Sequence, residues 1–518
     1  MPDRECKVTA LDGVILVVII LCMVGVGLTG EKKNETTEDF FLAGRKLRWY
    51  QIGFSLFATN FSASALIGLT GAAYLTGIAI YNYEWVGILA LVFFALVLVR
   101  VVRGSQVYTL SEYLERRYDA RIKVLYSVFI IFLIVFIEMA GALYAGGVLL
   151  SEVIPGLSMN FVIVLVMILA GLYSVLGGLN AISKTDIFQS IVLFISALLI
   201  AYFTLAASGG WSGFIKATPD EALSLIRGLD DRAVPWTGLV VGIPVLCTYF
   251  WMVNQNMVQW VLSANSETDA RRGLMFVGFL KLFILFIIIV PGIAAATLIP
   301  GLTDADRIYP ALLMEYLPPG VLGIVLAGFV AALMSNTDST LHAASTIITM
   351  DFVHKASPEI PAEKLVKLGR IITVIIIGIS ALWAPMIGNF GTLFEYVQGV
   401  LSYAVAPFVV IYLGGLFWPR ATAKGALAAL VAGFTASVLI GILGDGMGLI
   451  DIHYLYVPLP VAMISLLAFV IVSRLTTPHE VEAKLLWINT RAGHITLLDK
   501  VMAAALILLT FLLVAIFW

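Results

Sequence analysis

Six ionisable side chains fall inside stretches of sequence that are otherwise apolar. A charged group near the centre of a membrane helix costs roughly 2.5–3.5 kcal/mol on insertion scales, so such a residue usually has a function. The six are Glu84, Glu138, Asp186, Lys281, Asp338 and Glu395. Glu84 and Lys281 either line a site for a polar solute or simply neutralise each other as a buried pair. We expect Glu138 and Glu395 to lie nearer a membrane interface and to have structural roles.

Two apolar stretches are interrupted by hydroxyl and amide side chains. The first interruption is SLFATNFSASA at residues 55–65, and the second runs from Pro244 through Cys247 and Thr248 to Asn254 and Gln255. Polar groups at this depth are tolerated where they line a cavity, although Ser and Asn also join packed helices. The two segments have comparable places in successive blocks of five spans. This favours a broken first helix in each of two inverted repeats, with a transport site between them.

The ionisable and polar residues named above lie within long apolar segments of the sequence. Of the 518 residues, 61% are hydrophobic and 12% are charged, whereas soluble domains have about 25% charged residues. Apolar stretches of about twenty residues recur along the chain, and each is long enough to span a bilayer. We therefore predict an all-α membrane protein with about 14 transmembrane helices. The predicted spans are residues 8–29, 48–76, 79–100, 122–152, 160–178, 185–207, 235–262, 274–300, 310–350, 367–385, 390–418, 424–443, 453–473 and 497–518.

Basic residues are distributed unevenly between the predicted loops. If the N-terminus lies outside, 24 of the 31 Lys and Arg residues fall on the cytoplasmic side, six fall outside, and Lys281 lies within a span. Cytoplasmic loops carry such an excess of positive charge. We therefore predict a multi-pass protein of the cytoplasmic (plasma) membrane. An even number of spans places both termini outside.

Several classes of function do not suit this sequence. The net charge of -2 offers no basic surface for nucleic acid, so no nucleic-acid partner is expected. Cys6, Cys22 and Cys247 are widely spaced and do not have the pattern of a metal site or a disulfide framework. The absence of a nucleophile–base pair, a metal cluster and a phosphate-binding loop argues against an enzyme. The absence of a kinase or receiver domain argues against a solute sensor. The expected partners are a small solute, ions and the lipid bilayer.

Six strings of sequence occur in an order that is characteristic of one family. They are TEDFFLAG at 37–44, YEW at 83–85, YSVLGGLNA at 173–181, Thr185-Asp186 with Gln189, STIITMD at 345–351 and GGLFW at 414–418. Together they run through nearly the whole chain. In this respect the chain resembles the sodium/solute symporters, and within them the sodium/glucose branch with its bacterial sodium/galactose cotransporters.

The resemblance implies a LeuT-type fold, in which two inverted repeats of five helices form the core. Residues 1–518 would then be a single transmembrane transporter domain. Its parts would be a leading helix at 8–29, a first repeat at 48–207, a second repeat at 235–418 and trailing helices at 424–518.

The resemblance also implies a main sodium site between two core helices. In the family, backbone carbonyls of the broken first core helix and hydroxyls of the eighth hold this ion. The corresponding positions are Ala58, Phe61, Ala332, Ser335 and Asn336. A backbone carbonyl can coordinate an ion whatever its side chain, so Ala and Phe are acceptable at such positions. Asn336 departs from the usual hydroxyl and has a longer reach.

Some relatives hold a second sodium with an acid on the fifth core helix and two hydroxyl residues on the eighth. The corresponding residues here are Asp186, Asp338 and Ser339. Two carboxylates in place of one either hold a cation more tightly or share a proton. Alternatively, Asp186 only caps the helix that it begins.

Five sugar-binding positions of the galactose cotransporters keep a hydrogen-bonding side chain in this sequence. They correspond to Asn60, Tyr83, Glu84, Lys281 and Gln398. The inner-gate aromatic becomes Phe250, beside Trp251, and the outer-gate positions are Leu69, Tyr83 and Phe394. Three polar partners are replaced by Ala65, Gly87 and Cys247. Such losses change which solute a site accepts.

The function implied by the resemblance is sodium-coupled secondary active symport by alternating access. Sodium would bind from outside and order the site, a small polar solute such as a sugar or polyol would follow, and both would be released inside. A symporter for another organic solute, such as sialic acid, a carboxylate or an amino acid, is the alternative. Lys281 would suit an anion as well as a hydroxyl group.

Overall fold

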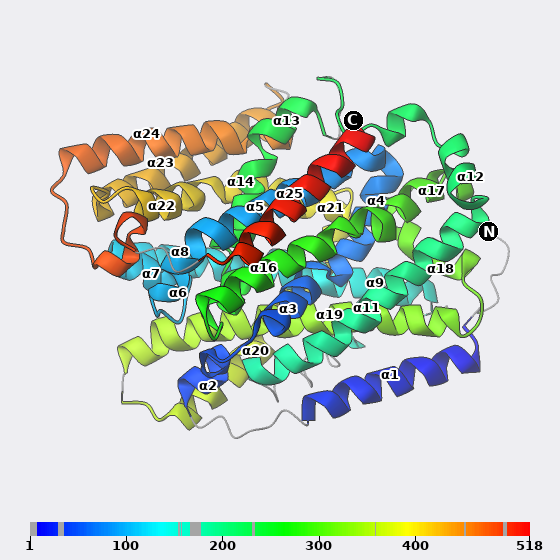
Figure 1. Cartoon of the computed structure of the whole chain (residues 1–518), viewed down its shortest axis with the longest axis horizontal. Helices are drawn as coiled ribbons and strands as arrows, with labels where there is room; N and C mark the ends of the chain where they lie inside the picture. The colour runs from blue at the N-terminus through cyan, green and yellow to red at the C-terminus, as the bar shows by residue number, and fades with distance from the viewer. Residues whose placement is uncertain are drawn as a thin grey trace.

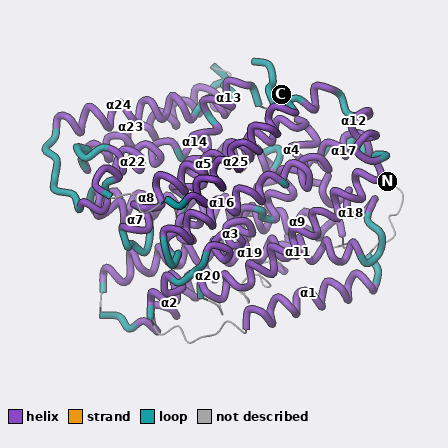
Figure 2. The backbone as a smooth tube through the Cα atoms, in the orientation of Figure 1, coloured by secondary structure: helices purple, strands orange, loops and turns teal. Residues whose placement is uncertain are grey.

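The computed structural model describes residues 8–28, 36–153, 156, 158–165, 178–229, 231, 234–357, 359–449, 452–490 and 495–518. Within these ranges every regular element is a helix, and extended backbone contributes only the isolated bridges Leu47–Ala264 and Arg227–Pro235. Long helices packed side by side make up the molecule (Figures 1 and 2). The predicted all-α class is confirmed.

Eleven helical stretches of the described chain are long and apolar enough to cross a membrane, or up to twelve if the bent helix pair Leu393–Ala404 and Ala406–Phe417 counts as one. They are Ala10–Gly27, Ala63–Gly104, Ala120–Val153, Leu179–Ala207, Trp236–Val253, Glu267–Leu298, Val321–His354, Glu363–Asn389, Ala423–Gly444, Tyr454–Leu475 and Leu497–Ile516. Most of the predicted span 160–178 lies outside the described residues. The chain is therefore a multi-pass membrane protein.

The longer spans are assembled from α-helices joined by π-helical or 3₁₀ turns. The helices of these stretches, of the bent pair and of the segments next to the two polar interruptions are α1 (Ala10–Leu28), α3 (Trp49–Asn60), α4 (Ala63–Thr76), α5 (Asn82–Phe93), α6 (Val99–Gly104), α8 (Ala120–Leu133), α9 (Ala140–Val153), α11 (Leu179–Ala207), α13 (Trp236–Val241), α14 (Ile243–Thr248), α15 (Gln255–Leu262), α16 (Glu267–Leu282), α17 (Val290–Leu298), α19 (Val321–Thr346), α20 (Ala362–Trp383), α21 (Leu393–Ala404), α22 (Ala406–Phe417), α23 (Ala423–Gly441), α24 (Pro458–Leu475) and α25 (Leu497–Ile516). Shorter helices outside the spans are α2 (Thr37–Leu42), α7 (Leu110–Arg117), α12 (Gly210–Ala217) and α18 (Ile308–Tyr316).

The first polar segment is a break between α3 and α4. Phe61 leaves the helical region at φ -84 and ψ 55, and Ser62 is extended at ψ 168. The Ser62 hydroxyl then accepts a hydrogen bond from the backbone N–H of Ala65, at 3.2 Å, and caps α4. A Ser cap replaces the missing helical hydrogen bond inside the membrane, which explains why this apolar span contains hydroxyl groups.

The second polar segment is a break between the π-helical turn η6 (Tyr249–Val253) and α15. Asn254 is extended at φ -72 and ψ 122, and its side chain accepts from the backbone N–H of Asn256 at 2.9 Å. Both spans that were predicted to be broken are therefore broken, each at a residue with a capping side chain.

The predicted span 310–350 begins later than expected. Its first part forms the separate short helix α18, and α19 starts at Val321. The intervening residues include Pro318, Pro319 and Gly320, and Gly320 has φ +85. Proline lacks the backbone donor and disfavours helix at the residue before it, so the helix ends before the proline pair.

The leading helix α1 packs along α11 and α19 at one edge of the molecule (Figure 1). Asp12 of α1 is fully buried and accepts hydrogen bonds from the backbone N–H groups of Gly320 and Gly323, at 2.7 and 2.8 Å. A carboxylate at a helix N-terminus satisfies its free N–H groups and favours the positive end of the helix dipole. A Cβ at Gly323 would lie 2.7 Å from Asp12 Cα, so glycine permits this close approach.

Candidate functional site

A cavity of about 170 Å³ lies between the two helix breaks. The end of α3 and the start of α4 border it at the first break, and η6 and the start of α15 border it at the second. Parts of α5, α8, the π-helical turn η4 (Ile134–Met139), α19 and α21 complete its wall. Seven residues predicted for the solute site or its gates line it, namely Asn60, Leu69, Tyr83, Glu84, Phe250, Phe394 and Gln398. Drug-sized ligands occupy pockets of roughly 300–1,000 Å³, so this cavity suits a small solute.

Lys281 and Glu84 form an ion pair beside the cavity. Lys281 comes from α16 and Glu84 from the first turn of α5, and both side chains are nearly inaccessible to solvent. The Lys281 ammonium also donates to Asn60 Oδ1 at 2.9 Å and lies 5.2 Å from the centre of the Trp251 ring. Glu84 and Asn60 line the cavity, whereas Lys281 and Trp251 stand behind them. The two charges are therefore paired and also contribute to the cavity wall.

Aromatic rings enclose the cavity at two places. Tyr83 and Phe394 meet edge to face with ring centres 5.3 Å apart, and the Tyr83 hydroxyl is 3.1 Å from that of Tyr454. Phe250 meets Trp251 edge to face at 5.1 Å. The predicted outer-gate residues Tyr83 and Phe394 are thus brought into contact, and the predicted inner-gate residue Phe250 forms another part of the wall.

The three positions that lack a polar side chain are not alike. Ala65 lines the cavity. A Cβ at Gly87 would come within 3.1 Å of Trp251 Nε1, so the indole occupies the space that a side chain would need. Cys247 is buried, with its sulfur 3.5 Å from the Tyr83 carbonyl oxygen. Only the loss at residue 65 therefore exposes an apolar surface directly to the cavity.

The residues of the predicted main sodium site come from two helices that pack together, α3 and α19. Ala58 lies in the last turn of α3 and Phe61 is its C-cap, so both carbonyls belong to a helix end where intrahelical partners run out. Ala332, Ser335 and Asn336 are spaced by three and four residues and share one face of α19. Phe61 and Asn336 also line the cavity. The predicted ion residues and the predicted solute residues therefore adjoin the same space.

The residues of the predicted second ion site are all buried, but their contacts differ. Asp186 accepts a hydrogen bond from the Ser335 hydroxyl at 2.5 Å, and thus contacts the main-site residues. Ser339 is 3.1 Å from the hydroxyl of Thr59, across the α3–α19 contact. Asp338, one residue before Ser339, is also buried. The alternative that Asp186 caps its helix is wrong, because α11 begins seven residues earlier at Leu179.

Glu138 lies in a place that the sequence prediction missed. It was expected near an interface with a structural role, but it lies in the π-helical turn η4 (Ile134–Met139) within the span Ala120–Val153 and lines the cavity. The signal was present, because an acidic residue stands in the middle of an apolar span. Glu395 behaves as expected, since it is exposed and completes the capping box of α21 with Thr392.

A further buried carboxylate lies just outside the spans. Asp306, between α17 and α18, accepts from the backbone N–H of Leu393 at 2.9 Å and from the Tyr144 hydroxyl at 3.3 Å. Burial raises the pKa of Asp306 to about 6, and the negative charges of Asp304 and Glu395 add to this effect. Through its hydrogen bond with Leu393, Asp306 fixes the first residue of α21, the helix that carries Phe394. Nothing in the local sequence distinguishes Asp306 from an ordinary loop acid.

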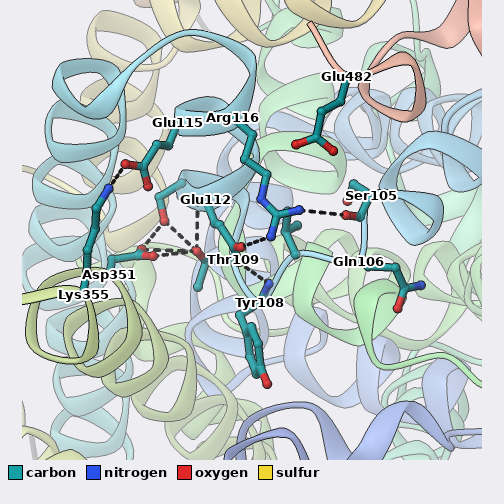
Figure 3. A network of polar contacts seen from close by, with 12 residues as sticks. Ser105, Gln106, Tyr108, Thr109, Glu112, Glu115, Arg116, Asp351, Lys355 and Glu482 are labelled. Atoms are coloured by element: carbon teal, nitrogen blue, oxygen red, sulfur yellow. Dashed lines mark hydrogen bonds and ion pairs between the residues drawn. The ribbon is translucent and has the colours of Figure 1, made fainter. Parts of the chain in front are cut away.

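A separate polar cluster lies on the side predicted to be cytoplasmic (Figure 3). Asp351, near the end of the α19 span, accepts from the Thr109 hydroxyl at 2.9 Å and lies 3.3 Å from the Lys123 ammonium. Lys123 also pairs with Glu115 at 2.9 Å, and Lys355 pairs with the same carboxylate. These contacts join α7 to the start of α8 and to the π-helical turn η9 (Ile347–His354), which follows α19. The residues do not line the cavity, so they position helices around it.

Comparisons with known proteins match most of the chain. A model of the sodium:solute symporter family matches residues 40–433. The chain is 32% identical over 483 residues to a sodium/glucose cotransporter of Vibrio parahaemolyticus, with 87% of this chain and 89% of that protein covered. It is 30% identical to sodium/myo-inositol cotransporter 2 of Oryctolagus cuniculus, with 95% and 80% covered.

One solved structure is similar over nearly the whole chain. It is a Na⁺-coupled sialic acid symporter in a substrate-bound, outward-open state, with a TM-score of 0.80 and 20% sequence identity. The similarity covers 92% of this chain and 100% of that one. At this level of identity the likeness shows a common fold.

Proposed function

The chain belongs to the sodium:solute symporter family, and we propose that it imports a small polar solute, a sugar or polyol, by coupling its movement to that of sodium. The observation that carries this proposal is the cavity between the two helix breaks. Asn60, Glu84 and Gln398 offer hydrogen-bonding groups in its wall, while Phe61 and Asn336 connect it with the α3–α19 contact. Ion binding and solute binding then act on the same helix break, which is what coupling requires.

The proposed architecture is a LeuT-type core of two inverted repeats at 48–207 and 235–418, with α1 before it and helices from residue 424 after it. This makes one transporter domain with fourteen spans. The helix breaks after Asn60 and after Val253 support this architecture, because each break interrupts the first span of its proposed repeat. Alternating access would arise by movement of the helices that carry these breaks relative to the others.

The proposed solute is a sugar or polyol, and the chemistry of the cavity supports this class. A polyhydroxy solute both donates and accepts hydrogen bonds, and the wall presents amides from Asn60 and Gln398 and the carboxylate of Glu84. Lys281 is already engaged by Glu84 and Asn60, so it is poorly available to bind an anionic solute. The names of the glucose and myo-inositol cotransporters among the relatives point the same way.

In the proposed mechanism, the sodium ion is bound by the carbonyl oxygens of Ala58, Phe61 and Ala332 with the side chains of Ser335 and Asn336. Binding joins the end of α3 to α19 and orders the first break. Asn60, at that break, is then held in position for the solute and for Lys281. Closure of Leu69, Tyr83 and Phe394 on one side and movement of Phe250 on the other would complete the cycle.

Transport by purified protein in proteoliposomes tests the proposal. With an inward sodium gradient, uptake and counterflow of labelled hexoses or inositols should exceed uptake without sodium. Ser335→Ala should raise the sodium concentration for half-maximal uptake about tenfold, which corresponds to about 1.4 kcal/mol. Ser196→Ala is the matched control, because Ser196 joins α11 to α19 through the Ile324 carbonyl without lining the cavity. Equal uptake in sodium-free buffer under a pH gradient would contradict the proposal.

A further inference from the structure

Glu138 is a cavity-lining carboxylate to which the mechanism above gives no task. It lies in the π-helical turn η4, 18 residues after Ala120 and 15 before Val153 in its span. π-Helical turns within α-helices frequently occur at functional sites. An ionisable residue at this depth is expensive unless it is used or compensated.

The hydrogen bonds of Glu138 come from uncharged groups. Asn254 Nδ2 donates to one carboxylate oxygen at 2.7 Å, and Asn256 Nδ2 donates to the other at 3.3 Å. The Thr340 hydroxyl lies 3.4 Å away. The described residues that line the cavity include no Lys, Arg or His. Because Lys281 already pairs with Glu84, Glu138 is the carboxyl group of the cavity wall that has no cation beside it.

Two neighbouring polar groups also lack a partner within the described structure. The Asn256 amide oxygen and the Tyr249 hydroxyl are buried without a hydrogen bond, and both residues line the cavity. The orientation of the Asn256 amide is determined by its neighbours, since its nitrogen donates to Glu138 and to Thr340 at 2.9 Å. Its oxygen must therefore find a donor elsewhere. A buried acceptor without a donor is costly, and a bound ligand can remove that cost.

We propose that Glu138, Asn256 and Tyr249 form a second solute subsite, which binds hydroxyl or ammonium donors and rejects carboxylate groups. This inference rests on the proposed function and deepens it. A hydroxyl or an amino group of the solute supplies the donors that the subsite lacks. A solute carboxylate would lie beside an acid that has no cation next to it, and two such groups oppose each other's ionisation because like charges repel strongly at low dielectric. The subsite therefore selects neutral polyhydroxy solutes and their amino derivatives over acids.

Competition among three matched solutes tests the subsite. A hexose, the corresponding hexosamine and the corresponding hexuronate are compared as inhibitors of sodium-dependent uptake of the labelled hexose or inositol. Their binding to purified protein is measured in parallel by thermal shift. For the wild type, half-maximal inhibition by the hexuronate should need a concentration at least about tenfold higher than half-maximal inhibition by the hexosamine. Glu138→Gln keeps the shape of the side chain and removes its charge. The ratio of the two inhibitory concentrations should therefore fall about tenfold in this variant.

Two further variants separate solute selection from a structural effect. Glu138→Asp keeps the charge with a shorter reach, so the difference between hexosamine and hexuronate should persist while all three bind more weakly. Thr340→Val removes the hydroxyl beside Glu138 and should also leave the difference in place. If Glu138→Gln takes up solute normally and keeps the wild-type difference between hexosamine and hexuronate, the proposed subsite is wrong but the proposed function stands. The same conclusion follows if Thr340→Val reduces that difference as much as Glu138→Gln does. Wild-type protein that neither binds nor transports any of the three would overturn the proposed function as well.

Discussion

Lys281 illustrates how a single residue combines structure and function in this protein. Its ammonium contacts Glu84, Asn60 and the face of Trp251, and it is almost completely buried. Removing one partner of a buried ion pair costs about 3–5 kcal/mol because the remaining charge is left uncompensated. Replacing both partners by neutral groups of similar size is often nearly neutral. Single and double substitutions therefore distinguish the two roles of the pair.

We predict that Glu84→Gln and Lys281→Met each abolish solute binding and lower the thermal stability of the purified protein. The double variant should regain most of the stability, because no buried charge is left alone, but it should not regain binding. Thermal unfolding and radiolabelled solute binding measure the two quantities separately. If the double variant binds solute normally, the pair has only a structural role.

The contact between Asp186 and Ser335 leads us to a second prediction, which concerns the number of ions transported. Because the Ser335 hydroxyl donates to Asp186, the acid and the proposed main sodium site are coupled through one hydrogen bond. If Asp186, Asp338 and Ser339 hold a second cation, two sodium ions should accompany each solute. A second charge doubles the electrical driving force, which is about 2.3 kcal/mol per charge and 100 mV.

The measurement is the ratio of sodium to solute taken up, in the wild type and in Asp186→Asn and Asp338→Asn. A ratio of two that falls to one in both variants supports the second cation. A wild-type ratio of one, with uptake that changes in a single step as pH is varied, supports a shared proton. A ratio of one that does not depend on pH would leave both carboxylates with structural roles.

Among the helices, the proposed function depends on helix ends that lie within the apolar spans. Ser62 and Asn254 cap the segments that follow the two breaks. Asp12 of α1 in the same way occupies the N-terminus of α19, the helix that carries Ser335 and Asn336. The leading helix therefore helps to hold the proposed ion-binding helix in place.

Asp12→Ala should destabilise the protein by about 2 kcal/mol or more, because each buried N–H left without an acceptor costs about 1–3 kcal/mol. Asp12→Asn should have a smaller effect, since its amide oxygen can still accept a hydrogen bond. Thermal unfolding in detergent measures both, and half-saturating sodium concentrations report any displacement of α19. A stability of Asp12→Ala equal to that of the wild type would show that α1 is not held by these bonds.

Asp306 makes the stability of the region around α21 depend on pH. Its pKa of about 6 in the folded protein lies above the ordinary value of 3.8, so the folded state holds the proton more tightly than the unfolded state. The contribution of this group to stability is therefore fully present below about pH 4 and is lost as pH rises through about 6. The shift corresponds to about 3 kcal/mol.

Relative to Asp306→Asn, the wild type should accordingly gain thermal stability as the pH is lowered from 7.5 to 5. The comparison with the variant removes the contributions of other titrating groups. Asp304→Asn is a suitable control, because it removes a neighbouring charge that raises the pKa of Asp306 without removing the hydrogen bonds to Leu393 and Tyr144. A difference between wild type and Asp306→Asn that does not vary with pH would contradict this prediction.

At the scale of the whole molecule, the distribution of charge predicts the orientation in the membrane. We expect the loop that contains Asp220 and both termini to lie outside, and the loop that contains Ser357 to lie inside. Both residues are exposed. Single cysteines, Asp220→Cys and Ser357→Cys, are introduced into a background in which Cys6 and Cys22 are replaced by serine. An impermeant thiol reagent applied to intact cells should label only the first, and the reverse pattern would contradict the predicted orientation.

The class of the molecule and the places where its helices break could both be predicted from the amino-acid sequence. Apolar stretches of membrane-spanning length allow little except helices, because backbone groups in lipid must be satisfied within the segment. The hydroxyl and amide groups around Ser62 and Asn254 were informative for the same reason, since only a break or a cavity justifies them. The start of α19 was misjudged because hydropathy continues through residues 310–320, although Pro318 and Pro319 were visible.

Which polar residues face one another depends on how the helices pack, and the sequence does not show it. Periodicity indicates the side of a helix on which a residue lies, but not which helix it meets, because partners can be hundreds of residues apart. Glu138 contacts Asn254 and Thr340, and Asp186 contacts Ser335. These contacts depend on how the broken spans pack against α8, α11 and α19. Glu138 was wrongly expected near an interface although it stands in the middle of an apolar span. The cavity that it lines, in contrast, is formed only when these helices pack together.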